Sequence, residues 1–300
     1  MSNLFRLLAV IGLLVSTPAW AAFRIVACEP EWASLAEALG GNDVKAESAT
    51  TGLQDVHHIQ ARPSLIARVR RADLVICTGA GLESGWLPLL LRQAGNPKIQ
   101  PGQPGFLAAS EYVEMLEVPV SLDRSQGDVH PYGNPHIQTD PRNILPIADA
   151  LVERLVTLDP ENADDYRGRH AAFTTRWKES VKGWTRRGAA LNGMTIVTHH
   201  NSWVYLVTWL GLNEVAALEP KPGIEPSAGH LARLLDSIGG HGVRLIIRTS
   251  YQSARASEWL SGRIDAPVVI LPHTVGSVDN TDNLFDLYEV MLTILERHAP

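Results

Sequence analysis

The sequence predicts an α/β protein of two lobes, each built on a parallel sheet, joined by a long helical segment. Short apolar runs alternate with stretches of helical periodicity over residues 23–78, and the same alternation returns over residues 194–298. This alternation is typical of parallel sheets with helices on both faces. Between the two regions, residues 140–188 carry an almost continuous helical pattern. The chain of 300 residues is long enough for two lobes.

The amino terminus has the pattern of a secretory signal peptide. Arg6 precedes a short apolar run that leads to Ala19 and Ala21, a small-residue cleavage pattern. The run is too short to span a membrane as a helix. We therefore expect export to the periplasm. The expected organisation is a signal peptide over residues 1–21, a first lobe over 22–145, a linking helical region over 146–190 and a second lobe over 191–300.

In the first lobe, strands are predicted where apolar residues run together, and helices where they recur with helical spacing. Gly40 ends the first helix, and Pro63 stands at the start of the second. A third strand is possible over residues 114–118, within a region rich in Pro, Gly and Asp. The main predicted elements of this lobe are strands at 23–28 and 72–78 and helices at 31–39 and 63–71.

The linking region and the second lobe follow the same reasoning. Pro160 interrupts the helical pattern between the lobes, which restarts directly after it. Ser227 is the expected N-cap of a helix in the second lobe. The predicted elements of the second lobe are strands at 194–198, 243–247 and 268–271 and helices at 202–210, 228–238 and 283–298.

Charge and cysteine content exclude some classes of protein. The formal net charge is −6, which does not favour nucleic acid or an acidic membrane surface as a partner. Two cysteines cannot make a disulfide-dense scaffold, so the fold must depend on its hydrophobic core. Cys28 and Cys77 each end a predicted strand of the first lobe. Because such ends can be neighbours in a doubly wound sheet, we predict a disulfide between them.

Three histidines at predicted junctions between elements are candidate ligands for one metal ion: His57, His136 and His200. Their long separation along the chain excludes a zinc finger and requires a prefolded scaffold. Neutral imidazoles on stiff loops suit Zn²⁺. Any one of them alone would more often be a loop histidine bonded to backbone, but three in equivalent contexts favour a shared site. His58 and His199 are adjacent to two of them and are not expected to bind the same ion.

A carboxylate fourth ligand has several candidates. Asp279, Asp282 and Asp286 all follow the last predicted strand, and each is also explained as a turn or capping residue. His130 precedes Pro131 in a polar loop, either as a transient metal-capturing group or as a solvated loop histidine. The residues themselves leave this choice open.

Several blocks of the sequence resemble the cluster A-I metal-binding solute-binding proteins of ABC transporters, particularly their zinc-specific periplasmic members. The likeness extends over nearly all of residues 23–298, although Val56 replaces the proline that is usual before the first histidine. The residues that carry it are Asp55 and His57 with Pro63 and Ser64; Asn134, Pro135 and His136 with Asp140 and Pro141; His200 with Ser202, Trp203 and Tyr205; and Glu225, Pro226 and Ser227.

The resemblance implies two Rossmann-like lobes joined by a long rigid helix, with metal held in the cleft between them. It also implies delivery of the metal to an ABC permease in the inner membrane. Members of the family often place an aspartate directly after the last strand, where this chain has Pro272 and His273. Asp279 is therefore the expected fourth ligand, with Asp282 and His273 as substitutes.

Together these observations predict a monomeric periplasmic protein that binds Zn²⁺ and performs no reaction. Three imidazoles and one carboxylate would close a four-coordinate site, and a mostly neutral set favours Zn²⁺ over Mn²⁺. A periplasmic zinc chaperone is a second candidate partner. The alternatives are a secreted zinc-dependent metallohydrolase, which needs a metal-bound water and a general base, a manganese-binding member of the same family, and a zinc store without a transporter.

Overall fold

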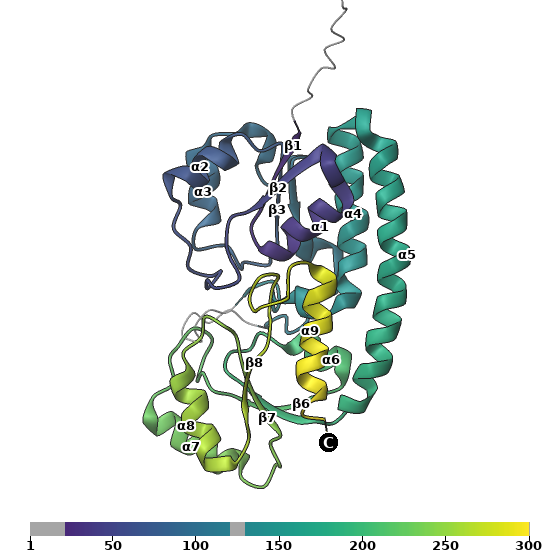
Figure 1. The fold of residues 1–300 in the computed structure, drawn as a ribbon. Coiled ribbons are helices and arrows are strands. Elements are labelled where there is room, and N and C mark those ends of the chain that lie inside the picture. The colour runs from purple at the N-terminus through teal and green to yellow at the C-terminus, as the bar shows by residue number, and fades with distance from the viewer. Residues whose placement is uncertain (1–21, 121–129, 300) are drawn as a thin grey trace, which may run out of the picture.

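The computed structural model describes residues 22–120 and 130–299, which form two α/β lobes (Figure 1). Each lobe contains a four-stranded parallel sheet, and the strand order is the same in both: β2-β1-β3-β4 in the first and β6-β5-β7-β8 in the second. The predicted fold class is confirmed. The predicted signal peptide, residues 1–21, lies outside the described residues. The expected bounds of the lobes and of the linking region stay a prediction.

The first lobe is organised around two buried central strands. In β3 all four residues are buried, and in β1 the last three are, because helices cover both faces of the sheet. Parallel pairing brings Ala27 opposite Ile76. The elements of this lobe are β1 (Phe23–Ala27), α1 (Pro30–Gly40), β2 (Val44–Ser48), α2 (Pro63–Arg70), β3 (Leu74–Cys77), α3 (Leu87–Ala94) and β4 (Phe106–Ala108).

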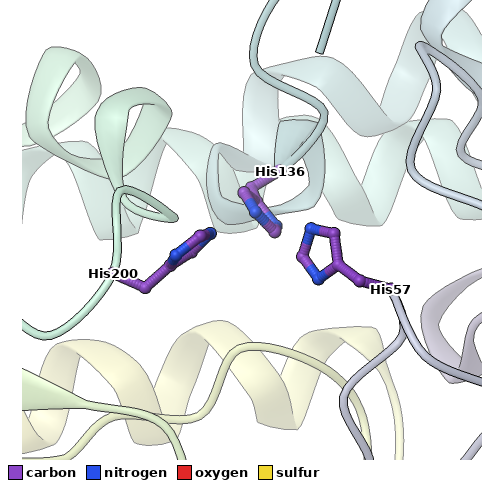
Figure 2. Close-up of side chains that lie close together, drawn as sticks. All are labelled: His57, His136 and His200. Atoms are coloured by element: carbon purple, nitrogen blue, oxygen red, sulfur yellow. The ribbon is translucent and has the colours of Figure 1, made fainter. Parts of the chain in front are cut away.

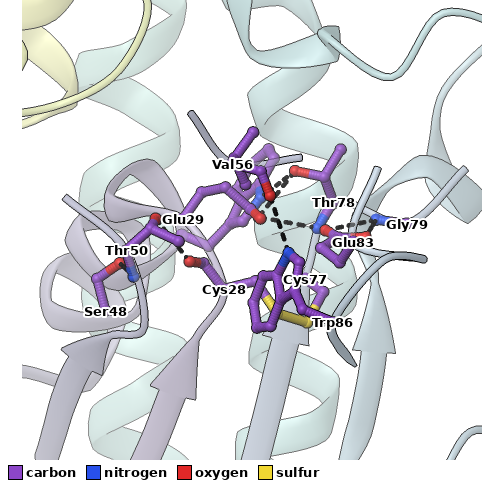
Figure 3. Close-up of a disulfide and its surroundings, with 11 residues drawn as sticks. Cys28, Glu29, Ser48, Thr50, Val56, Cys77, Thr78, Gly79, Glu83 and Trp86 are labelled. Carbon is purple, nitrogen blue, oxygen red and sulfur yellow. Dashed lines mark hydrogen bonds between the residues drawn. A yellow bond between two sulfur atoms is a disulfide. The ribbon is translucent and has the colours of Figure 1, made fainter. Parts of the chain in front are cut away.

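A disulfide joins the carboxyl ends of β1 and β3, as predicted (Figure 3). Cys28 follows β1 directly and Cys77 is the last residue of β3, with their Cα atoms 4.7 Å apart. Thr50 donates a hydrogen bond from its hydroxyl to the Cys28 carbonyl over 2.8 Å. Trp86 donates from its indole nitrogen to the Val56 carbonyl, also over 2.8 Å. These bonds hold the start of the loop that carries His57 and the residue directly before that histidine.

The second lobe repeats this arrangement. β5 and β7 are its central strands, and Ser227 caps α7 by accepting a hydrogen bond from the His230 backbone, as expected. The elements of this lobe are β5 (Thr195–Thr198), α6 (Val204–Leu210), β6 (Asn213–Ala217), α7 (Ala228–Ile238), β7 (Leu245–Arg248), α8 (Ala254–Ile264), β8 (Val268–Ile270) and α9 (Leu284–Glu296).

Two antiparallel helices connect the lobes: α4 (Ile144–Leu158) and α5 (Ala163–Gly188), separated by a short turn that begins at Pro160. α5 has 26 residues and runs along one side of the molecule from the first lobe to the second (Figure 1). Its buried aromatic face packs against α9, with the Trp177 ring centroid 5.5 Å from that of Tyr288. No helix within residues 22–120 and 130–299 is long and apolar enough to cross a membrane.

The largest hydrophobic core passes through both lobes. It contains Ile25 and Ile76 of the first sheet, Ile196 and Leu245 of the second, and Trp177 of α5, all buried. Two smaller cores lie beneath the outer helices, one under α2 and α3 and one under α7 and α8. The lobes are therefore joined by a common apolar interior as well as by α5.

One predicted strand is absent. Residues 114–118 are irregular, and Glu117 adopts a left-handed backbone conformation with φ of 53°. A non-glycine residue in this region interrupts the extended geometry of a strand. The segment instead crosses to the second lobe, where the Leu116 amide donates to the Tyr205 hydroxyl oxygen.

Candidate metal centre

His57, His136 and His200 lie together, and their side chains are buried (Figure 2). One nitrogen from each ring lies within 4.8 Å of the corresponding nitrogens of the other two. The three pairs of ring centroids are 5.5, 5.6 and 5.7 Å apart. His57 belongs to the first lobe and His200 to the second, directly after β5. The carboxyl ends of both sheets thus meet at this group, the usual place for a ligand in such folds.

His57 is oriented by the carboxylate two residues before it. Asp55 Oδ1 lies 2.8 Å from His57 Nδ1 and also accepts a hydrogen bond from the His57 amide at 3.0 Å. Burial would raise the pKa of Asp55, but its bonds to His57 outweigh this effect and lower the pKa. The Asp55 carboxylate therefore holds the Nδ1 proton. Nε2 of His57 is left buried without a partner among the described residues.

His200 is held in the same manner by Glu219, which follows β6. Glu219 Oε2 lies 2.7 Å from His200 Nδ1 and also accepts from the Gly223 amide at 2.8 Å. β6 pairs with β5, so the strand end that carries His200 is next to the one that carries Glu219. The sheet register therefore positions this histidine–carboxylate pair.

His136 lies on a stiff turn between the lobes. Its amide donates to Asn134 Oδ1 at 3.1 Å, and the Asn134 carbonyl accepts from the Tyr205 hydroxyl at 2.8 Å. Burial, and then the nearby rings of His200 and His57, lower the pKa of His136 well below its usual value. The ring is therefore neutral at neutral pH. Its Nε2 is buried without a partner in the described chain.

These features suit a metal ion. Buried nitrogens almost always have a partner, so the unpaired Nε2 atoms of His57 and His136 indicate a missing one. Zn²⁺ binds imidazole nitrogens at about 2.0 Å, which places neighbouring donors in a tetrahedron roughly 3.3 Å apart. The three donors lie within 4.8 Å of one another, so each pair needs to approach by at most about 1.5 Å to reach that distance. A carboxylate behind a ligating imidazole is the usual second contact in such sites.

The structure does not bring Asp279 to this group of donors. Asp279 and Asp282 are exposed in the loop between β8 and α9, and neither belongs to the histidine group. Asp286 lies in the first turn of α9, where it accepts a hydrogen bond from Asn283. His273 is nearer and lines a cavity with His136, but its ring packs against Tyr251, with centroids 5.2 Å apart.

Sequence reasoning missed the orienting roles of two residues and left the role of a third, His130, open. Asp55 and Glu219 were not predicted to orient histidines, although Glu219 follows a strand that is a neighbour of β5. His130 lies beside the group, its ring centroid 5.4 Å from that of His57 and 6.5 Å from that of His136. Asp140, by contrast, caps the next turn by accepting a hydrogen bond from the Arg142 amide.

Two cavities adjoin the histidines. One, of about 170 Å³, is lined by His130, His136 and His200 together with Glu117 and Asn201. The other, of about 260 Å³, is lined by Asp55, His57, His199, His200 and Glu219, among others. His200 lines both cavities, so each of them adjoins the donor group.

Comparison with known proteins identifies the family. The sequence model described as "Zinc-uptake complex component A periplasmic" matches residues 25–298. The chain is 22% identical over 219 residues to the high-affinity zinc uptake system protein ZnuA of Bacillus subtilis (strain 168), covering 72% of this chain and 67% of that protein. It is 25% identical over 156 residues to the manganese ABC transporter substrate-binding lipoprotein PsaA of Streptococcus pneumoniae, covering 51% and 47%.

Another relative is longer. The zinc-binding protein AdcA of Streptococcus pyogenes serotype M6 is 23% identical over 146 residues, which are 49% of this chain but only 28% of AdcA. Among solved structures, a crystal structure of ZnuA has a TM-score of 0.77 at 21% identity and covers 93% of this chain and 100% of its own. A periplasmic metal-binding protein of Candidatus Liberibacter asiaticus has a TM-score of 0.74 at 17% identity, with 92% and 98% covered. Because the family's sequence model extends over nearly the whole chain, the chain belongs to the ZnuA family of periplasmic zinc-uptake components.

Proposed function

We propose that this protein is a periplasmic zinc-binding protein that delivers Zn²⁺ to the permease of an ABC importer. The observation that carries the proposal is the buried group of His57, His136 and His200. Carboxylates hold the Nδ1 atoms of His57 and His200. The family membership supports a solute-binding role. We further propose that the protein acts as a monomer, with a periplasmic zinc chaperone as an additional partner.

The donor chemistry favours Zn²⁺ over Mn²⁺. All three donors of the group are imidazole nitrogens, which suit zinc, whereas manganese prefers sets rich in carboxylate and water. The nearby carboxylates of Asp55 and Glu219 are engaged with ring nitrogens. They contribute negative charge behind the imidazoles, which offsets the charge of a divalent ion.

Metal analysis of the purified mature protein tests the proposal. We expect one Zn²⁺ per chain, bound more tightly than Mn²⁺ in competition with a chelator of known affinity. His57→Ala, His136→Ala and His200→Ala should each weaken zinc binding at least about a hundredfold, because each removes a direct donor. The exposed neighbour gives a matched control, His58→Ala, which should bind zinc nearly as the unaltered protein does. Absence of zinc binding, or tighter binding of manganese, would reject the assignment.

A growth experiment tests delivery. In the host deprived of its own copy, growth under zinc chelation should require this protein together with an importer permease. The unaltered chain should restore growth, and the His57→Ala variant should not. Equal restoration by both would separate the physiological role from metal binding and contradict the proposal.

A further inference from the structure

The ring of His130 is the closest imidazole neighbour of His57. Their centroids are 5.4 Å apart, a shorter separation than any pair within the group of His57, His136 and His200. His130 and His136 are also in ring contact, at 6.5 Å and nearly perpendicular. His130 therefore lies beside the three donors, on the side of the cavity that also contains Glu117 and Asn201.

One nitrogen of the His130 ring is bonded to the protein, as it is in His57 and His200. The ring makes a hydrogen bond to the backbone of Gly81, and Nδ1 is its atom nearest to the position where a Gly81 side chain would begin. Gly81 has a φ of +91°, and a Cβ there would also approach Pro131 to 3.4 Å. The glycine thus lets the His130 loop approach closely. One ring nitrogen is tied to the protein, as Nδ1 is in His57 and His200.

The second nitrogen of His130 has no partner. Its Nε2 is buried and unpaired among the described residues, like the Nε2 atoms of His57 and His136. A buried ring nitrogen normally has a partner, and the ring contacts of His130 with His57 and His136 place this one beside the three donors. His130 is not among the residues whose donor atoms lie within 4.8 Å of one another, so ligation requires its ring to move toward them.

We propose that Nε2 of His130 is the fourth donor to the ion held by His57, His136 and His200. This inference rests on the proposed function and deepens it, because it replaces the expected carboxylate with a fourth imidazole. Four nitrogens complete the tetrahedral shell that Zn²⁺ prefers. The negative charge that a carboxylate ligand would supply comes instead from Asp55 and Glu219, acting through the Nδ1 atoms of their histidines.

The other candidates are placed less well. Asp279 and Asp282 are exposed, whereas the Nε2 atom of His130 is buried. His273 also has an unpaired buried nitrogen, Nδ1, but its ring neighbour is Tyr251. Among the described residues, the His130 ring is in contact with the rings of His57 and His136, whereas the His273 ring contacts only that of Tyr251. By ring distance, His130 is the stronger candidate.

The test compares His130→Ala with Asp279→Ala in the mature protein. Zinc affinity is measured by chelator competition, and the number of imidazole ligands by X-ray absorption of the zinc-loaded protein. We expect four imidazoles in the unaltered protein and three in His130→Ala. Loss of residues that only support ligands lowers affinity about 10- to 100-fold, so loss of a ligand should cost at least tenfold. Asp279→Ala should retain both the affinity and the four imidazoles.

Three imidazoles in the unaltered protein, or unchanged affinity in His130→Ala, would overturn this inference. Loss of affinity in Asp279→Ala alone would restore the carboxylate as the fourth ligand. Thermal unfolding of the metal-free variants checks that each is folded. If His57→Ala abolishes binding while His130→Ala does not, only the fourth donor is wrong. If the unaltered protein binds no zinc, the proposed function itself fails.

Discussion

A carboxylate behind an imidazole does two things at this centre. The bonds from Asp55 to His57 and from Glu219 to His200 fix each ring in the tautomer whose free nitrogen is Nε2. They also make the ring a stronger donor, since negative charge stabilises the positive charge that a bound ion induces on the imidazole. The affinity of the site for metal therefore depends on residues that do not touch the ion.

Glu219→Gln tests this dependence. The amide keeps the size of the side chain and its acceptor oxygen but removes the charge, so zinc affinity should fall about 10- to 100-fold. The measurement is chelator competition at fixed pH. Glu225 is exposed nearby, and Glu225→Gln, which removes the same charge outside the histidine pair, should have little effect. Equal losses of zinc affinity in the two variants would mean that affinity depends on the overall negative charge of the second lobe and not on the bond between Glu219 and His200.

At the scale of single residues, the sequence predicted the three histidine donors better than it predicted the fourth ligand. His57, His136 and His200 stand beside prolines or strand ends in recognisable blocks, so their convergence could be expected. Asp279 lies in a loop without periodicity, where sequence carries no information on the direction of a side chain. His130 was noticed, but its position beside His57 depends on the close approach of its loop to Gly81, which is a tertiary contact.

Among the elements, the irregular segment around Glu117 links the loops of two candidate ligands. Glu117 Oε2 accepts hydrogen bonds from Asn134 at 3.0 Å and from Asn201 at 2.8 Å. Asn134 belongs to the turn that carries His136, and Asn201 follows His200. One carboxylate thus holds the two loops at a fixed separation. Its left-handed backbone aims the side chain at both amides, at a cost in strain that is common near functional sites.

Glu117→Ala should therefore loosen the centre without removing a donor. We expect zinc affinity to fall several-fold, with faster release of zinc to a chelator in stopped-flow mixing, because the loops of His136 and His200 are no longer tied. Glu114 is exposed on the same segment, and Glu114→Ala is the matched control. Unchanged release from Glu117→Ala would show that the two amide bonds do not contribute to retention.

Strand prediction succeeded for the central strands and for β8, and it missed the other three edge strands. β1, β3, β5 and β7 are apolar runs buried by helices on both faces, which the sequence displays directly. β2 and β6 are half-buried edge strands with polar residues, and β4 has three residues. α3 was also not predicted. The pairing partners of the edge strands, which the sequence does not display, determine their conformation.

Across the whole molecule, three buried carboxylates lie between the sheet of the first lobe and the second lobe. Glu29 accepts hydrogen bonds from the Thr78 amide and hydroxyl (Figure 3), and Glu31 accepts one from Thr274 of the second lobe. Burial raises the pKa of Glu31 and of Glu83 to about 7, and that of Glu29 well above its usual value. At neutral pH, charge that develops in this cluster destabilises the folded protein.

Because the pKa of Glu31 is raised in the folded protein, the free energy of unfolding falls as the pH rises. The stabilising contribution of Glu31 is fully present below about pH 4.5 and is lost as the pH rises through about 7. In Glu31→Gln no charge develops, so the variant should gain stability relative to the unaltered protein between pH 5 and 8, by on the order of 3 kcal/mol. Urea unfolding of the metal-free proteins measures the difference. Glu37→Gln, an exposed change on the same helix, should show no such trend.

The 26-residue α5 also limits how this protein can take up and release its ion. At 1.5 Å per residue the helix is about 39 Å long, and it contacts α1 in the first lobe and α9 beside the second. Separating the lobes as rigid bodies would break these contacts and open an apolar core that both sheets share. Exchange of the ion by rearrangement of the histidine loops avoids that cost. We therefore expect the backbone scaffold to stay nearly static, and the kinetics of loading to depend on the loops that carry the histidines.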